Sequence, residues 1–150
     1  MSYSLDANIL LYASNTAAPE HAAARQFLES CAGRAELLCL GWPTLMAYLR
    51  ISTHSGIFPS PLTQEEAQRN VDGLANLPHV RLISEADGYW DLFTEVTRVA
   101  PARGNQVPDA HLATLLKQHD VSVLYTNDAD FRRFEFLEVR ALPATSALRK

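Results

Sequence analysis

Two spacings of apolar residues recur along this chain, one typical of buried strands and one typical of helices with a single apolar face. A β-branched, apolar run at residues 121–126 predicts a buried strand. Helical spacing predicts a helix over residues 19–31, with Ala23 and Phe27 on its buried face. The same two patterns predict further strands at residues 2–5, 36–40, 80–83 and 138–141, and further helices at residues 7–13, 43–54, 86–99 and 108–119.

Residues typical of helix starts stand in front of several of these segments. Asp6 stands at the N-cap position of the helix predicted for residues 7–13. Thr63 and Glu66 have the spacing of a capping box and predict a further helix that starts after residue 63. Pro108 suits the first turn of the helix that follows it. The helix starts can therefore be predicted from local chemistry.

The order of the elements indicates the fold class. Strands separated by helices imply right-handed crossovers and a mostly parallel sheet with helices on both faces. We therefore expect an α/β protein with a three-layer α/β/α architecture. A chain of 150 residues is typical of one domain, and residues 1–150 are expected to form it.

Four aspartates follow strands or open helices in this predicted sheet. Asp6 stands at the carboxyl end of the first strand, and Asp128 and Asp130 follow the strand at residues 121–126. Asp109 lies in the first turn of a predicted helix. Because ligands of such sheets bind outside the carboxyl ends of the strands, we expect the four carboxylates to converge at one edge.

Each aspartate also has an ordinary explanation of its own. Asp6 is a common N-cap, Asp109 complements a helix dipole, and Asp128 and Asp130 belong to a typical turn sequence. Together, however, clustered carboxylates repel one another and need a counter-charge. A hard divalent cation such as Mg²⁺ is the simplest one, and it can activate water for attack on a phosphodiester.

Composition narrows the function classes. The formal net charge is −4, with 17 acidic against 13 basic residues, which disfavours a protein that simply coats nucleic acid. No apolar stretch is long enough for a membrane span, and the N-terminus has no signal-peptide pattern. Cys31 and Cys39 do not form a disulfide framework, so we expect two free thiols and a cytoplasmic protein.

Three motifs together resemble a known family. LDANILLYA contains Asp6 and Asn8, VPDAHLATLL contains Asp109, and LYTNDADFRRF contains Asp128 and Asp130. In their order and spacing these motifs resemble a PIN-domain nuclease of the VapC type, the toxin of bacterial toxin–antitoxin pairs. LRISTHSGIFPSPLTQEEA is similar to the mycobacterial-type branch of these toxins. The resemblance covers nearly the whole chain.

The resemblance implies an activity and partners. Proteins of this family are metal-dependent endoribonucleases that cut structured RNA such as tRNA or rRNA, form homodimers and are silenced by a VapB-type antitoxin. Asp6, Asp109 and Asp128 are then expected to hold Mg²⁺ or Mn²⁺, directly or through water. Asp130 is expected to be a further ligand or to orient the attacking water.

Three residues are candidates for substrate binding. Asn8 belongs to the first motif. The resemblance suggests that Arg50 reaches a substrate phosphate or pairs with the acids near Asp6; a plain surface arginine is the alternative. Arg103 lies in the loop at residues 100–107, where it suits contacts to an RNA backbone.

One departure from the family pattern bears on activity. The family carries a glutamate on the helix after the second strand, and this position falls at Leu45. There is no Asp or Glu between Glu36 and Glu65. The chain is therefore expected to have a single metal site, with a weakened or absent second one. Two alternatives stay open: a catalytically impaired PIN module that binds RNA or a protein, and a DNA-directed PIN nuclease.

Overall fold

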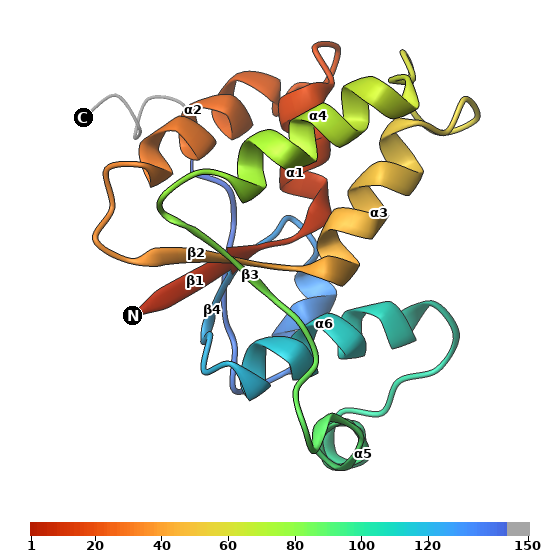
Figure 1. The fold of residues 1–150 in the computed structure, drawn as a ribbon. Helices are drawn as coiled ribbons and strands as arrows, with labels where there is room; N and C mark the ends of the chain where they lie inside the picture. The colour runs from red at the N-terminus through yellow and green to blue at the C-terminus, as the bar shows by residue number, and fades with distance from the viewer. Residues whose placement is uncertain (144–150) are drawn as a thin grey trace.

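Five strands form the centre of the molecule in the computed structural model, which describes residues 1–143 (Figure 1). Their order in the sheet is β3-β2-β1-β4-β5, and every neighbouring pair is parallel. The expected sheet is thus confirmed, and it is parallel throughout. The strands are β1 Ser2–Leu5, β2 Leu37–Gly41, β3 Val80–Ile83, β4 Val123–Tyr125 and β5 Glu138–Arg140.

Helices cover both faces of the sheet. Within residues 1–143 the α-helices are α1 Ala7–Ser14, α2 His21–Cys31, α3 Trp42–Ser52, α4 Gln64–Ala75, α5 Tyr89–Val99 and α6 Val107–Gln118. Residues 1–143 also contain two 3₁₀ turns. The turn η1, Gly104–Gln106, directly precedes α6, and η2, Ala129–Arg133, follows β4. Helices α1–α4 pack on one face, and α5, α6 and η2 on the other, which confirms the three-layer α/β/α fold (Figure 1). No helix within residues 1–143 is long and apolar enough to cross a membrane.

Capping chemistry explains where α4 starts, and a turn explains the later start of α2. The side chain of Thr63 accepts a hydrogen bond from the N–H of Glu66, and the Glu66 carboxylate accepts one from the N–H of Thr63. The predicted capping box is therefore confirmed. Helix α2 starts at residue 21 rather than 19, because the His21 N–H closes a turn on the carbonyl of Ala18.

Helix α5 starts three residues later than predicted, at Tyr89. Gly88 precedes it with φ +83°, a left-handed conformation that suits glycine and interrupts a helix. The segment before Gly88 is held instead by Gln118 of α6, whose side chain accepts from the N–H of Ala86 and donates to its carbonyl. The β3–α5 loop is thereby fixed to α6.

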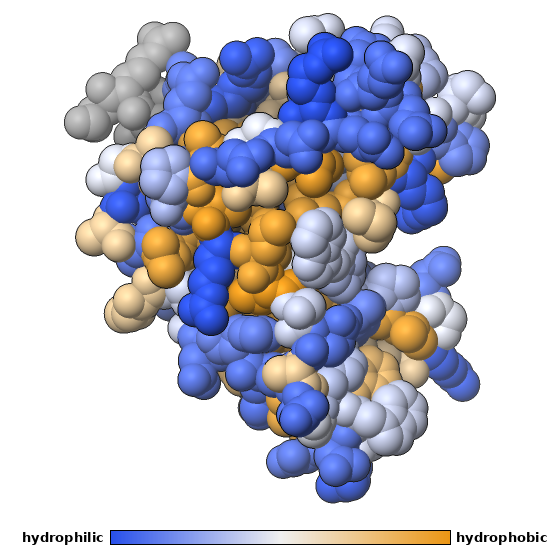
Figure 2. All heavy atoms as spheres, viewed as in Figure 1, coloured by the Kyte–Doolittle hydropathy of each residue, from blue (hydrophilic) through white to orange (hydrophobic). Residues whose placement is uncertain are grey.

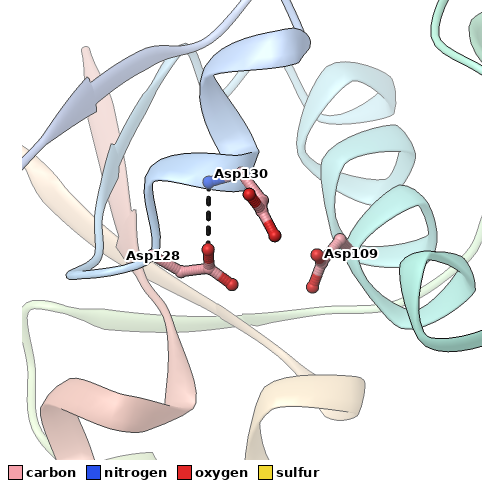
Figure 3. A group of neighbouring side chains, drawn as sticks. All are labelled: Asp109, Asp128 and Asp130. Atoms are coloured by element: carbon pink, nitrogen blue, oxygen red, sulfur yellow. Dashed lines mark hydrogen bonds between the residues drawn. The ribbon is translucent and has the colours of Figure 1, made fainter.

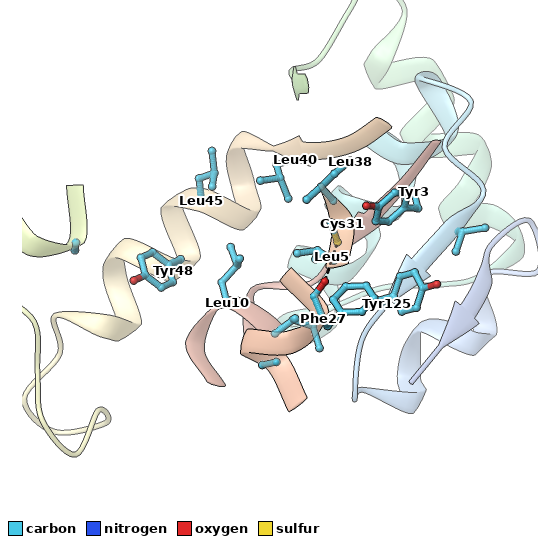
Figure 4. Close-up of a cluster of buried hydrophobic side chains, with 14 residues drawn as sticks. Tyr3, Leu5, Leu10, Phe27, Cys31, Leu38, Leu40, Leu45, Tyr48 and Tyr125 are labelled. Carbon is cyan, nitrogen blue, oxygen red and sulfur yellow. Dashed lines mark hydrogen bonds between the residues drawn. The ribbon is translucent and has the colours of Figure 1, made fainter. Parts of the chain in front are cut away.

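Alternation along the strands divides the core into two clusters. Leu38 and Leu40 of β2 face α1–α4, whereas Cys39 between them faces α5 and α6. Figure 4 shows the first cluster, in which Tyr3 and Phe27 pack with these leucines. This is the side-chain alternation expected of a strand buried on both faces.

The two cysteines lie in different clusters. Cys31 is buried with α1–α4 and Cys39 with α5 and α6, on opposite faces of the sheet. They are free thiols, as predicted. The single domain predicted for residues 1–150 stays a prediction, and residues 144–150 lie outside the described part.

Strand β3 forms one edge of the sheet, and no described strand pairs with its outer side. In the view of Figure 1 this strand lies toward the reader. Figure 2 shows a band of apolar side chains across the middle of the same view, between the polar surfaces of α4 and α5. The surface along this sheet edge is therefore largely apolar, and Arg81 is the exposed polar residue of β3.

Candidate metal and phosphodiester site

The carboxyl ends of β1 and β4 lie side by side and lead directly into the candidate site. Leu5 of β1 is paired with Tyr125 of β4, and the Asp6 N–H donates to the carbonyl of Tyr125 at 2.9 Å. The ladder therefore continues to Asp6. The two motifs that are farthest apart in the sequence meet at this edge, as predicted.

Three carboxylates form the closest acidic group in the described residues. One oxygen of each of Asp109, Asp128 and Asp130 lies within 4.8 Å of the others (Figure 3). Asp109 comes from the first turn of α6, Asp128 caps η2, and Asp130 lies in η2. The Asp130 N–H donates to Oδ1 of Asp128 at 2.9 Å, which fixes these two residues relative to each other.

Asp6 lies beside this group and is joined to it through Thr126. The buried Thr126 hydroxyl donates to Oδ2 of Asp6 at 2.9 Å and accepts from the N–H of Asp128 at 3.0 Å. Oδ1 of Asp6 accepts from the N–H of Ala7 at 2.7 Å, so Asp6 is also the N-cap of α1. The structure thus places Asp6 at the site but outside the closest group.

Asn8 completes the same network and leaves one oxygen free. Its Nδ2 donates to Oγ1 of Thr126 at 3.3 Å. Its Oδ1 is buried and has no hydrogen-bond partner among the described residues. A buried amide oxygen without a partner is costly unless water, a cation or a ligand donor satisfies it. Asn8 therefore offers an oxygen to such a group.

Burial and, after it, carboxylate repulsion raise the pKa values of two aspartates of the site. Burial, followed by the charges of Asp128 and Asp6, raises the pKa of Asp109 to about 6. Burial also raises the pKa of Asp6, although hydrogen bonds from Thr126 and Ala7 oppose this rise. The site therefore resists full ionisation unless a positive charge enters it.

The chemistry of these donors fits a hard divalent cation. Carboxylate and amide oxygens are the ligands that Mg²⁺ and Mn²⁺ prefer, and Mg²⁺ binds through a few carboxylates while it keeps several waters. Asp130 is exposed, so the group opens to solvent on that side. A substrate phosphate can approach there.

The two candidate arginines occupy different places. Arg103 is exposed directly before η1, which leads into α6 and hence to Asp109. Arg50 is exposed in the last turn of α3. It lies eight residues after Trp42, which opens this helix at the carboxyl end of β2. That separation is roughly 12 Å along the axis. Arg50 pairs with none of the site carboxylates in the described chain.

Leu45 lies in the core rather than in the acidic site. Its side chain has 0% exposure and packs in the cluster that also contains Leu10 and Tyr48 (Figure 4). Helix α3 contributes no carboxylate, because its sequence contains no Asp or Glu. A carboxylate at position 45 would be buried among apolar side chains.

Sequence reasoning missed the roles of two residues, Thr126 and Arg133. Thr126 ends the predicted strand and belongs to the third motif, but the motif does not indicate that its hydroxyl connects Asp6 to Asp128. Arg133 donates to backbone carbonyls of the loop that enters α6. No spacing pattern in the sequence indicates that contact.

The fold and this acidic edge define a family. Residues 3–137 match the family model of the PIN domain. The chain is 36% identical over 140 residues to Ribonuclease VapC48 of Mycobacterium tuberculosis, which covers 93% of this chain and 97% of that protein. Ribonuclease VapC37 of the same species is 34% identical over 131 residues, with 87% and 90% covered. The chain therefore belongs to the PIN-domain family, in its VapC group.

Solved structures with the same fold include toxins and toxin–antitoxin complexes. M. tuberculosis VapC20, described as a sarcin–ricin loop cleaving toxin, superimposes with a TM-score of 0.69 at 16% identity, covering 93% of this chain and 99% of that one. VapBC2 from Rickettsia felis bound to a promoter DNA fragment gives 0.66 at 22% identity, covering 95% and 100%. These likenesses support the three-layer fold.

Proposed function

We propose that this chain is a metal-dependent endoribonuclease and the toxin of a type II toxin–antitoxin pair. The observation that carries the proposal is the group formed by Asp109, Asp128 and Asp130, with Asp6 beside it. This group is rich in hard oxygen donors, and the pKa of Asp109 is raised by its burial and, after that, by the neighbouring negative charges of Asp128 and Asp6. Similarity to proteins named VapC ribonucleases supports the same activity.

In this proposal Asp109, Asp128 and Asp130 hold Mg²⁺ or Mn²⁺, and Asp6 acts beside them directly or through water. A bound cation would supply an acidified water and would neutralise charge on the phosphoryl oxygens. Thr126 orients Asp6 by donating to its carboxylate. Asp130, at the exposed side, is the residue best placed to meet the attacking water.

The proposed substrate is structured RNA, such as tRNA or rRNA. Asn8 would contact substrate or its bound water with its free Oδ1, and Arg103 would contact a phosphate next to α6. Arg50 is a more distant phosphate contact, in line with its place at the far end of α3. The site is open on the Asp130 side, which suits a looped or single-stranded segment whose phosphate can enter it.

A VapB-type antitoxin is the proposed partner, because solved structures with this fold are VapBC complexes.

A homodimer is the proposed assembly. It is supported by large apolar side chains at the surface, including Trp42 (41% exposed), Met46 (49%) and Trp90 (69%). Light scattering on the purified chain tests the dimer. Two buried free thiols fit a reducing compartment, and we propose the cytoplasm.

The direct test maps RNA ends in cells after induction of the chain without its partner. Wild type should stop growth and produce a few discrete new ends. Asp109→Asn should abolish both effects, because it removes a charged ligand and keeps the side-chain shape. Asp72→Asn is the matched control: the same substitution on the exposed surface of α4 should leave both effects intact.

The alternative is a catalytically impaired module that binds RNA or a protein partner. It is favoured by one observation, the absence of a carboxylate on α3. A wild-type chain that leaves all RNA ends unchanged, yet binds RNA tightly, would establish this alternative and overturn the nuclease proposal.

A further inference from the structure

Arg133 connects η2 to both ends of the loop that joins α5 to α6. Its Nη1 donates to the carbonyl of Pro101 at 2.7 Å, and its Nη2 makes a longer contact of 3.5 Å with the carbonyl of Gln106. Pro101 lies two residues after α5, and Gln106 directly precedes α6. One guanidinium group thus holds the whole loop against η2.

The two elements joined in this way carry the two halves of the acidic group. Asp109 lies three residues after Gln106, in the first turn of α6. Asp128 is the N-cap of η2, and Asp130 is the second residue of this turn, which ends at Arg133. Figure 3 shows these carboxylates facing one another across the space between α6 and η2. The arginine contact therefore bears on the separation of Asp109 from the other two.

The surroundings of Arg133 favour a guanidinium specifically. Its Cζ lies 4.8 Å from the centre of the buried Phe134 ring, and a planar fork can donate to two carbonyls at once. Its Nε is buried without a partner in residues 1–143. An unpaired buried N–H costs stability, which weighs against a purely stabilising role. The neighbouring Arg132 is exposed and makes no such contact.

We propose that Arg133 is a positioning residue of the metal site, which sets the distance of Asp109 from Asp128 and Asp130 and so the affinity for a divalent cation. The inference rests on the proposed metal-dependent function. The inference also predicts the direction in which the cation affinity changes when Arg133 is replaced. Through charge alone, loss of an arginine beside carboxylates would tighten cation binding. Loss of a positioning residue weakens it.

Calorimetric titration of the full chain with Mn²⁺ separates the two effects. Arg133→Met keeps the apolar stem and should weaken Mn²⁺ binding by about tenfold, the usual size for residues that orient metal ligands. Arg133→Lys keeps the charge but lacks the fork, and should also weaken binding. Arg132→Met removes the same charge next to it and should leave the affinity unchanged or slightly tighter.

Hydrogen exchange of the metal-free proteins supplies a second readout. Arg133→Met should speed exchange at residues 100–110 and leave the strands unchanged, whereas Arg132→Met should change neither. Equal or tighter Mn²⁺ binding by Arg133→Met overturns the inference while the proposed function stands. Full rescue by Arg133→Lys overturns it as well. A wild type that does not bind Mn²⁺ overturns the proposed metal site itself. If exchange at residues 100–110 is then also unchanged in Arg133→Met, Arg133 does not hold the loop before α6 either.

Discussion

Two neighbouring residues at the end of β4 belong to two very different polar clusters. The Tyr125 hydroxyl accepts from Nη1 of Arg34 and Nη1 of Arg140, each at 3.2 Å. Arg34 pairs with Glu36, and Arg140 with Glu138. In this Tyr125 cluster, formed by these five residues, each positive charge has a negative partner, and the hydroxyl joins the two pairs.

The acidic site begins one residue later, at Thr126, and its charges do not balance. Four aspartates gather around it, and Arg133 is the cation that partly offsets the raised pKa of Asp109. A charge-balanced cluster can serve the fold alone. An unbalanced one costs stability in the absence of a cation, which supports the proposal that this site binds one. Charge balance is therefore the property that distinguishes the Tyr125 cluster from the acidic site.

The largest expected effect is on RNA cleavage. Asp128→Asn removes one charged donor from the acidic site and should lower the cleavage rate of a susceptible RNA by about 100-fold or more. Arg34→Met disturbs the Tyr125 cluster and should leave the rate near that of wild type. Gel-based kinetics with saturating Mg²⁺ measure both. Similar losses in the two variants would mean that the clusters are not functionally distinct.

A charge placed in the core should have the next largest effect. Leu45→Glu buries a carboxylate among apolar side chains and should lower the free energy of unfolding by about 3 kcal/mol or more, without tightening Mn²⁺ binding. Leu45→Met is the volume-matched control and should cost less than about 1.5 kcal/mol. Urea unfolding provides both values. Tighter Mn²⁺ binding by a folded Leu45→Glu variant would place α3 in the acidic site after all.

Asp109→Asn should stabilise the metal-free protein at pH 8, by about 1–2 kcal/mol after allowance for solvent screening. The reason is that the folded state raises the pKa of Asp109 from 3.8 to about 6. Wild-type stability is therefore favoured below the unfolded pKa and is lost as the pH rises through about 6. The advantage of the variant should vanish near pH 4. Thermal unfolding across this range, with EDTA present, would show a constant difference if Asp109 titrated normally.

The smallest expected effect concerns the Tyr125 cluster. Arg34→Met removes a hydrogen bond to Tyr125, an ion pair with Glu36 and a guanidinium stacked 4.0 Å above the Tyr3 ring. The loss should be about 1 kcal/mol of stability, because the pairs are partly exposed. Mn²⁺ affinity should not change. A clear change in affinity would show that the two clusters are coupled through β4.

Much of this arrangement could be predicted from the sequence. Alternating elements indicate a parallel sheet, and the carboxyl-end rule brings Asp6 and the Asp128 turn together. The rule does not say which oxygens lie closest. That depends on η2, which turns Asp130 toward Asp109, and on Thr126, whose hydroxyl holds Asp6 beside the group and joins it to Asp128. The hold of Arg133 on the α5–α6 loop depends on tertiary contacts for which the chain has no local signal.

The starts of α5 and β4 were predicted less well, for reasons of local geometry. Gly88 adopts a left-handed conformation that ends the preceding loop and delays α5. Asp120 also has positive φ, and the Val121 N–H donates to the carbonyl of Leu116, so this residue closes α6 rather than opening β4. Propensity favours a strand at Val121, but the helix end determines its conformation.

Anomalous diffraction from crystals soaked in Mn²⁺ tests the central claim most directly. The account predicts a peak between α6 and η2, with oxygens of Asp109, Asp128 and Asp130 about 2.1 Å away or one water further. No peak should lie in the charge-balanced Tyr125 cluster. An empty acidic site at saturating Mn²⁺, with the three carboxylates ordered and free of lattice contacts, would contradict the assignment of this edge as a metal centre.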